Sequence, residues 1–242
     1  MTQDVGNMRI DVLADGPYKV SGGVPLSRVE IVVDENGDSV GYKETYRYPE
    51  AKTQATYVLC RCGRSADKPF CDGSHVGEFH DETNASEVAE YADGAETIMG
   101  GGMELFDSSA FCIGARFCDR AGGVWGLTEA SGRPGANPAF KETAISEATL
   151  CPSGRLVMVN LETGKPMEPD LAPSIALIED PSNKTSAAIW VRGGIPVYGP
   201  DGEPFELRNR VTLCRCGASR NKVFCDASHY SVNFDDGHAA GE

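Results

Sequence analysis

Short runs of apolar residues, separated by turn-forming residues, recur along the chain. Residues 9–13 (RIDVL) alternate between polar and apolar side chains, which is typical of a strand with one buried face. Residues 29–33 and 188–191 are more continuously apolar and rich in β-branched side chains, which indicates strands with greater burial. We therefore expect a mainly β fold of the α+β class with few short helices.

The composition supports a folded, turn-rich chain. Of its 242 residues 40% are hydrophobic, which is enough to bury a core. The 28 glycines and 14 prolines fall between the β-branched runs, where they favour tight turns. The net charge of −14 argues against nucleic acid and against an anionic membrane as partners, because both are themselves negatively charged.

The cysteines are best interpreted as metal ligands. The first residues, Met1, Thr2, Gln3 and Asp4, lack the features of a signal peptide, and no apolar run approaches the roughly 18 residues of a spanning helix. We therefore expect a cytoplasmic protein. Thiols stay reduced in that compartment, so that nine cysteines favour metal binding over disulfides.

Six of the nine cysteines lie in two copies of one pattern. Each copy reads C-x-C, then eight residues, then C-x3-H. The candidate ligands are Cys60, Cys62, Cys71, His75, Cys214, Cys216, Cys225 and His229. Upstream, residues 20–26 (VSGGVPL) match residues 191–197 (VRGGIPV) at an offset of 171, against 154 at the cysteines, a difference of 17 residues. The chain is thus a duplication, with other sequence inserted in and between its copies.

The spacing within each copy suits a site with two irons. In an extended segment both side chains of C-x-C point to the same side, so that both thiolates can bind one iron. Cys71 and His75 are four residues apart, which places them on one face of a helical turn, where they can bind the second iron. Asp72 and Ser74 are typical residues for the start of such a turn.

The first copy resembles the CDGSH iron–sulfur (mitoNEET-like) family, whose pattern is C-x-C-x2-[S/T]-x3-P-x-C-D-G-[S/T]-H. It meets every position, including Ser65 and Pro69. The second copy keeps Ser219 and all four ligands, but Val223 replaces the proline and Ala227 the glycine. We expect the alanine to cost little, on the assumption that its backbone is right-handed.

The resemblance implies one [2Fe-2S] cluster per motif, held by three cysteines and one histidine. Such a cluster is redox-active and, in some relatives, passes to acceptor proteins. Single-motif relatives pair as homodimers, so we expect this chain to form the pair internally as a monomer. The alternative is a zinc-binding interaction module, because zinc also accepts three cysteines and one histidine. Zinc sites usually carry C-x2-4-C pairs, so C-x-C followed by C-D-G-S-H favours the cluster.

The remaining cysteines, Cys112, Cys118 and Cys151, lie between the two copies. Their spacing is similar to a bacterial ferredoxin run in which Ala115 stands in place of the second ligand. The insert resembles the divergent single-cluster ferredoxin-like domain that often accompanies CDGSH motifs. This resemblance implies a [3Fe-4S] or [4Fe-4S] cluster on the three cysteines. The alternative is that they are small buried apolar residues.

We expect a first CDGSH domain over residues 8–95, a ferredoxin-like insert over 96–171 and a second CDGSH domain over 172–238. The insert should contain one or two helices. The expected function is electron transfer or redox sensing, and cluster donation to apo-proteins is the alternative. The partner is then a redox protein or an apo-protein acceptor of unknown identity. We expect a carrier rather than an enzyme, because neither a hydrolase motif nor a dinucleotide fingerprint stands out.

Overall fold

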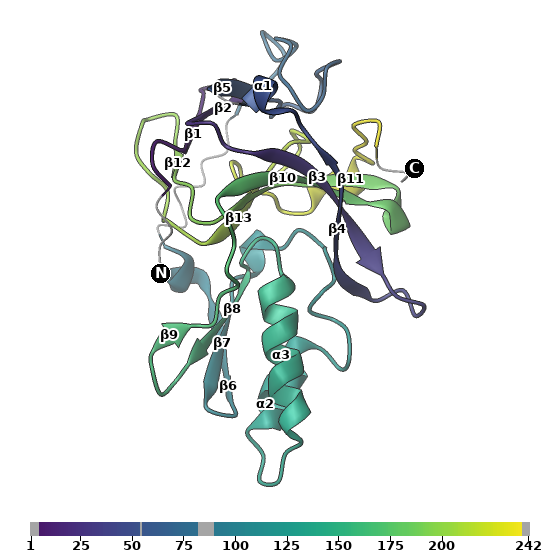
Figure 1. Ribbon diagram of the computed structural model, residues 1–242, viewed down its shortest axis with the longest axis vertical. Helices are drawn as coiled ribbons and strands as arrows, with labels where there is room; N and C mark the ends of the chain where they lie inside the picture. The colour runs from purple at the N-terminus through teal and green to yellow at the C-terminus, as the bar shows by residue number, and fades with distance from the viewer. Residues whose placement is uncertain (1–4, 54, 82–89, 239–242) are drawn as a thin grey trace.

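The computed structural model describes residues 5–53, 55–81 and 90–238. The expected mainly β fold is confirmed: the described strands form sheets of four, five and four strands. In Figure 1 two of these sheets make up the upper part of the molecule, and the third lies below them beside two helices. Residues 1–4, on which the expectation about the start of the chain rests, lie outside the described residues. Within the described ranges, no helix has the length and apolar character that crossing a membrane requires.

The first sheet has the order β12-β1-β2-β5. Its strands are β1 (Arg9–Val12), β2 (Tyr18–Ser21), β5 (Thr56–Leu59) and β12 (Val197–Tyr198). The alternation predicted for residues 9–13 is present in β1, where Ile10 and Val12 are buried. The edge strand β12 comes from the second half of the chain and runs parallel to β1.

The second sheet has the order β13-β11-β10-β3-β4. Its strands are β3 (Leu26–Val33), β4 (Ser39–Arg47), β10 (Ser174–Asp180), β11 (Thr185–Arg192) and β13 (Arg210–Leu213). The strands predicted at residues 29–33 and 188–191 are confirmed within β3 and β11. All of residues 188–191 are buried, whereas within residues 29–33 only Val29 and Ile31 are.

The two copies of the repeat exchange a strand. Ile10 of β1 pairs with Val197 of β12, and Ile175 of β10 pairs in the same parallel manner with Leu26 of β3. Both donated strands follow the repeated Gly-Gly-x-Pro segment, at residues 22–25 and 193–196. Each copy therefore completes its sheet with a strand of the other. The additional residues of the first copy include β4 and the short helix α1 (Glu50–Thr53), which lie between β3 and β5.

The insert forms the third sheet, of order β6-β7-β8-β9, together with helices α2 and α3. Its elements are β6 (Glu96–Gly100), β7 (Met103–Asp107), α2 (Val124–Ser131), α3 (Pro138–Leu150), β8 (Leu156–Asn160) and β9 (Lys165–Pro166). Helix α3 begins at Pro138, and the Asn137 side chain caps it by accepting the amide of Ala139 at 3.0 Å. The remaining short helices are η2 (Tyr91–Gly94), η3 (Ser109–Phe111), η4 (Pro181–Asn183) and α4 (Ser228–Ser231).

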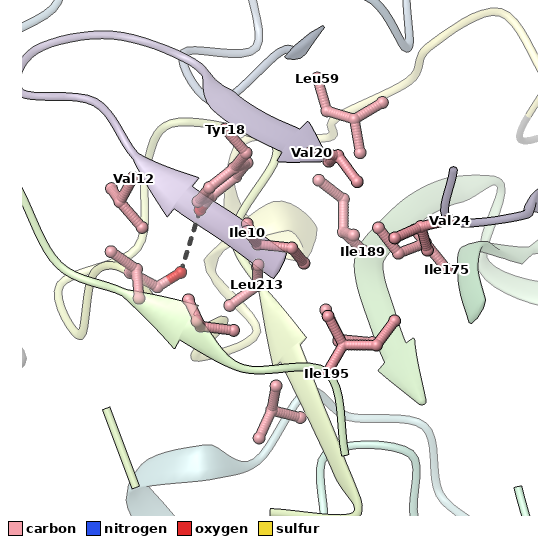
Figure 2. Close-up of a cluster of buried hydrophobic side chains, with 14 of the residues drawn as sticks. Ile10, Val12, Tyr18, Val20, Val24, Leu59, Ile175, Ile189, Ile195 and Leu213 are labelled. Carbon is pink, nitrogen blue, oxygen red and sulfur yellow. Dashed lines mark hydrogen bonds between the residues drawn. The ribbon is translucent and has the colours of Figure 1, made fainter. Parts of the chain in front are cut away.

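The main apolar core joins the first two sheets. Figure 2 shows Ile10 and Val20 of the first sheet beside Ile189 and Leu213 of the second. Tyr18 is fully buried in this core, and its hydroxyl lies 2.8 Å from the carbonyl oxygen of Cys214. A core side chain of the first sheet therefore supports the backbone that carries a candidate ligand of the second motif.

Candidate metal centres

The four ligands of the first motif lie in two adjacent pairs. The sulfurs of Cys60 and Cys62 are 3.8 Å apart, and both residues are buried. The Cys71 sulfur lies 3.3 Å from Nδ1 of His75, and both of these residues are partly exposed. Burial raises the pKa of the Cys60 thiol to about 11. A metal cation bound to the thiolate would lower this pKa again.

The second motif repeats this arrangement closely. The sulfurs of Cys214 and Cys216 are 3.7 Å apart, and the Cys225 sulfur is 3.4 Å from Nδ1 of His229. Across the described part of the chain, no three His, Cys, Asp or Glu side chains gather closely enough to hold one metal ion. The donor atoms of each motif are brought together as pairs.

The C-x-C segments lie in bends immediately after β5 and β13, not within an extended strand as the spacing argument assumed. The two sulfurs are adjacent nevertheless. The Cys60 amide donates to the carbonyl of Pro69 at 2.8 Å, and the Cys214 amide donates to that of Val223 at 2.9 Å. Val223 therefore occupies the same place in its turn as Pro69.

An aspartate holds the turn that carries each cysteine–histidine pair. Asp72 accepts the amides of Ala66 at 2.8 Å and Ser74 at 2.9 Å, and these bonds lower the pKa of its carboxyl group. Asp226 accepts the equivalent amides at 2.9 and 3.0 Å. The predicted helical turn that joins the cysteine to the histidine is not formed. Helix α4 begins at Ser228, after Cys225, and residues 74–78 of the first motif form hydrogen-bonded turns, with a left-handed residue between the two ligands in each motif.

Ala227 differs from its expected conformation. Its φ of 70° is left-handed, as is the φ of 92° at the equivalent Gly73. The expectation that alanine costs little here was wrong, because it assumed a right-handed backbone. The turn needs a left-handed residue before the histidine, and an L-alanine adopts that region at a cost of about 1 kcal/mol or more.

An arginine lies between the first two cysteines of each motif, and the sequence reasoning assigned it no role. Arg61 is buried: its Nε donates to the carbonyl of Gly16 at 2.7 Å, and its Nη2 to that of Leu13 at 2.9 Å. It also forms an ion pair with Asp81. It thus ties the first C-x-C bend to the turn between β1 and β2.

Arg215 makes the same set of contacts in the second motif. It donates to the carbonyls of Ala187 at 2.7 Å and Ile178 at 2.8 Å, and it pairs with Asp236. A signal for this role was present, because Arg recurs in both C-R-C segments. Residues 79–81 (FHD) also match residues 234–236 (FDD), so that the repeat continues beyond the ligands.

The two histidines lie in different surroundings. His229 is only 1% exposed, and Tyr230 covers it with its ring centroid 4.3 Å away. Burial, together with Arg215, lowers the pKa of His229 to about 4. Within the described structure its Nε2 is buried without a hydrogen-bond partner. The residue that corresponds to Tyr230 in the first motif is Val76, which is 75% exposed beside the partly exposed histidine.

Cys118 interacts electrostatically with both of the other middle cysteines, Cys112 and Cys151, although the three thiols are not gathered closely enough in the described structure to hold one metal ion. Cys118 and Cys151 both pack against the apolar core of the insert. Burial, then Cys151 and Cys112, raise the pKa of Cys118 to about 12. Ala115, at the position of the missing ligand, is buried in a different core that it shares with Cys225. Position 115 therefore lies in the core beside the second sheet rather than in the core that holds Cys118 and Cys151.

Comparisons with known proteins match three regions of the chain to two families. Residues 15–76 and 187–230 match the family described as iron-binding zinc finger of the CDGSH type. Residues 98–161 match the family described as divergent 4Fe-4S mono-cluster. Neither a curated protein nor a solved structure matches the chain.

Proposed function

We propose that this chain, an iron–sulfur protein in which two CDGSH-type regions flank a divergent 4Fe-4S mono-cluster region, carries two [2Fe-2S] clusters and works in electron transfer or redox sensing. One observation carries the proposal. The same two pairs, cysteine with cysteine and cysteine with histidine, recur in both motifs with distances that agree within 0.1 Å. The proposed ligands are Cys60, Cys62, Cys71, His75, Cys214, Cys216, Cys225 and His229.

The pairwise arrangement suits a two-iron core. In each motif the C-x-C pair would hold one iron, and the cysteine–histidine pair would hold the other. Soft thiolates with one imidazole are donors that iron–sulfur clusters accept. A structural zinc ion would instead draw four ligands around one centre. The paired donors therefore favour the diiron interpretation over the zinc-binding module.

The histidine sets the charge of each site. Two ferric ions, two sulfides and three thiolates sum to −1 with a neutral imidazole, whereas a fourth thiolate would give −2. A bound cluster of this kind takes up and releases one electron, and the less negative form accepts it more readily, as in Rieske centres. His75 and His229 are thus proposed to raise the reduction potential of their sites.

Metal and sulfide analysis of anaerobically purified protein tests the proposal. We expect two irons and two acid-labile sulfides for each CDGSH motif, with visible absorption and an electron paramagnetic resonance (EPR) signal after reduction. His75→Cys and His229→Cys should each lower the potential of one cluster. His80→Gln is the control, because the His80 side chain is 67% exposed and lies outside the motif. Stoichiometric zinc without sulfide would refute the proposal.

The middle cysteines are proposed to hold a third cluster, either [3Fe-4S] or [4Fe-4S], on Cys112, Cys118 and Cys151. The electrostatic interaction of Cys118 with Cys112 and Cys151 and the family match of the insert support this assignment. Iron in excess of the two CDGSH sites should disappear in Cys118→Ala and persist in Thr97→Ala, a control at an exposed position of the same insert. Equal iron content in parent and Cys118→Ala would show that these thiols are structural.

Cluster donation is a second candidate function, and the exposure of the first motif favours it there. Cys71 and His75 are partly exposed, so that an acceptor could reach them, whereas Cys225 and His229 are 2% and 1% exposed. Incubation with an apo-ferredoxin should then empty the first site before the second. Retention of both clusters while the reduced protein still reduces an oxidised ferredoxin would support a carrier alone.

A further inference from the structure

The C-x-C bends of the two motifs lie back to back. A Cβ atom at Gly63 would lie only 2.5 Å from the carbonyl oxygen of Cys216, and a Cβ at Gly217 would lie 2.5 Å from that of Cys62. Both glycines have left-handed backbones, with φ of 75° and 79°. The two bends therefore touch through reciprocal contacts that only glycine permits, and they bring the two ligand sets next to each other.

The middle segment is fixed against the second motif on one side of Cys112. The ring of Phe111 packs edge-on against Phe224 with centroids 5.1 Å apart, and Phe224 directly precedes the ligand Cys225. The Asn221 side chain donates to the carbonyl of Ala110 at 2.9 Å. The residues that precede Cys112 thus contact the turn that carries a second-motif ligand.

The residues that follow Cys112 also contact the second motif. Tyr230, which follows the ligand His229, lies with its hydroxyl 3.1 Å from the carbonyl of Gly114, and its ring leaves no space for a side chain there. Ile113 shares a buried apolar core with Cys225. Burial is the main cause that raises the pKa of Cys225, and the Cys112 thiol also contributes. Cys112 is therefore held at the second motif from both sides.

The first motif makes different contacts at the equivalent positions. Phe70, which corresponds to Phe224, packs against Tyr48 and Tyr57 of its own half, with centroids 5.6 and 6.3 Å apart. Val76, which corresponds to Tyr230, is 75% exposed. The ligand turn of the first motif therefore faces solvent where that of the second motif faces the insert.

We propose that these contacts hold the three ligand sets in one row, with the middle cysteines against the second motif, the second motif against the first, and the first motif at the solvent-exposed end. The proposal rests on the proposed function, because it requires a cluster on each set. In such a row, the residues of the first motif would hold the cluster that meets an external one-electron donor, and the second motif would lie between it and the middle cysteines. Such a transfer would change only the valence of iron and would neither form nor break a bond.

EPR relaxation measures the order of the row directly. In a His75→Cys background, the four-cysteine signal of the first cluster is distinguishable from the histidine-ligated signal of the second. Adding Cys118→Ala should then lower the half-saturation power of the second-cluster signal several-fold and leave that of the first unchanged. In a His229→Cys background, the same response should move to the four-cysteine signal. A response of the first cluster equal to or larger than that of the second overturns the proposed order.

A second measurement avoids any change in the insert. A soluble dysprosium chelate, added to the reduced His75→Cys protein, should speed relaxation of the first cluster and have little effect on the second. Equal or stronger relaxation of the second cluster would overturn the assignment of the exposed end. Iron and sulfide counts on the same samples keep the two hypotheses separate: missing clusters refute the proposed function, whereas full clusters with the wrong relaxation pattern refute only the row.

Discussion

Replacing Ala227 by glycine should stabilise the protein. The residue has a φ of 70°, and the equivalent position of the first motif is Gly73 with a φ of 92°. A left-handed L-residue costs about 1–2 kcal/mol relative to one in its ordinary backbone region. Glycine also has more conformational freedom in the unfolded chain, which lowers the free energy of unfolding by about 0.4–1 kcal/mol and offsets part of this stabilisation. We therefore expect Ala227→Gly to raise the free energy of unfolding by about 1 kcal/mol.

The reciprocal variant Gly73→Ala isolates the backbone effect. A Cβ atom at Gly73 would meet no other atom within 4 Å, so that only the left-handed conformation opposes it. It should destabilise by about the same 1 kcal/mol. For a chain of this length, each kcal/mol shifts the melting temperature by about 2–4 °C.

The assay is thermal unfolding of the anaerobically purified protein at one fixed scan rate, followed by the far-ultraviolet circular dichroism of the backbone. Ala227→Gly should raise the melting temperature, Gly73→Ala should lower it, and the double variant should return close to the parent. If Ala227→Gly leaves the melting temperature unchanged while Gly73→Ala lowers it, the left-handed conformation at position 227 is wrong. If both variants are neutral, the backbone argument fails at both turns.

Three further predictions concern buried polar groups. Burial raises the pKa of the Glu147 carboxyl to about 7 in the folded chain, against 4.5 in the unfolded chain. The ionised carboxylate therefore destabilises the fold increasingly as the pH rises from 4.5 to 7, and it has no such effect below pH 4.5. Melting curves should therefore show Glu147→Gln stabilising the protein, with a gain about 1 kcal/mol larger at pH 8.5 than at pH 6; a gain that shrinks with pH would contradict the sign. Asp236→Asn removes a buried negative charge that pairs with Arg28 and Arg215. The free energy of unfolding measured in urea should fall by about 3–5 kcal/mol. An unchanged urea midpoint would contradict the burial of this network. Tyr18→Phe removes the hydroxyl beside the Cys214 carbonyl and should cost about 1 kcal/mol in the same assay; a neutral result would mean that this hydrogen bond contributes nothing.

Local features of the site could be predicted because they depend on a few consecutive residues. The spacing correctly predicted that Cys71 and His75 are adjacent, with donor atoms 3.3 Å apart, and its repeat gives the same pair in the second motif. The helical turn assumed for that adjacency is absent, because a left-handed residue lies between the two ligands. The alternation in residues 9–13 likewise reports a half-buried strand, which β1 is. The left-handed Ala227 could also have been read from its alignment with Gly73, since glycine before a helical turn signals that conformation.

The pairing of strands depends on contacts that no local pattern specifies. β12 is two residues long, and its partner β1 lies more than 180 residues earlier in the chain. Periodicity reports which face of a strand is buried but not which strand it joins. The exchange of β3 and β12 between the two copies therefore emerges only when both sheets share one core. The contacts of Arg61 and Arg215 share this limit, because the Nε atoms of the two arginines donate to carbonyl groups 45 and 28 residues away in the chain.

The difference between the two motifs follows from what each one packs against. Their ligand pairs are nearly identical in geometry, because the duplicated sequence repeats every short-range bond that shapes the turns. Beyond those turns the symmetry ends. Tyr230 lies against Gly114 of the insert and covers His229, whereas Val76 leaves His75 partly open to solvent. One inserted segment can thus turn a symmetric duplication into two sites of unequal exposure, so that under the proposed function an external partner would reach the first ligand set before the second.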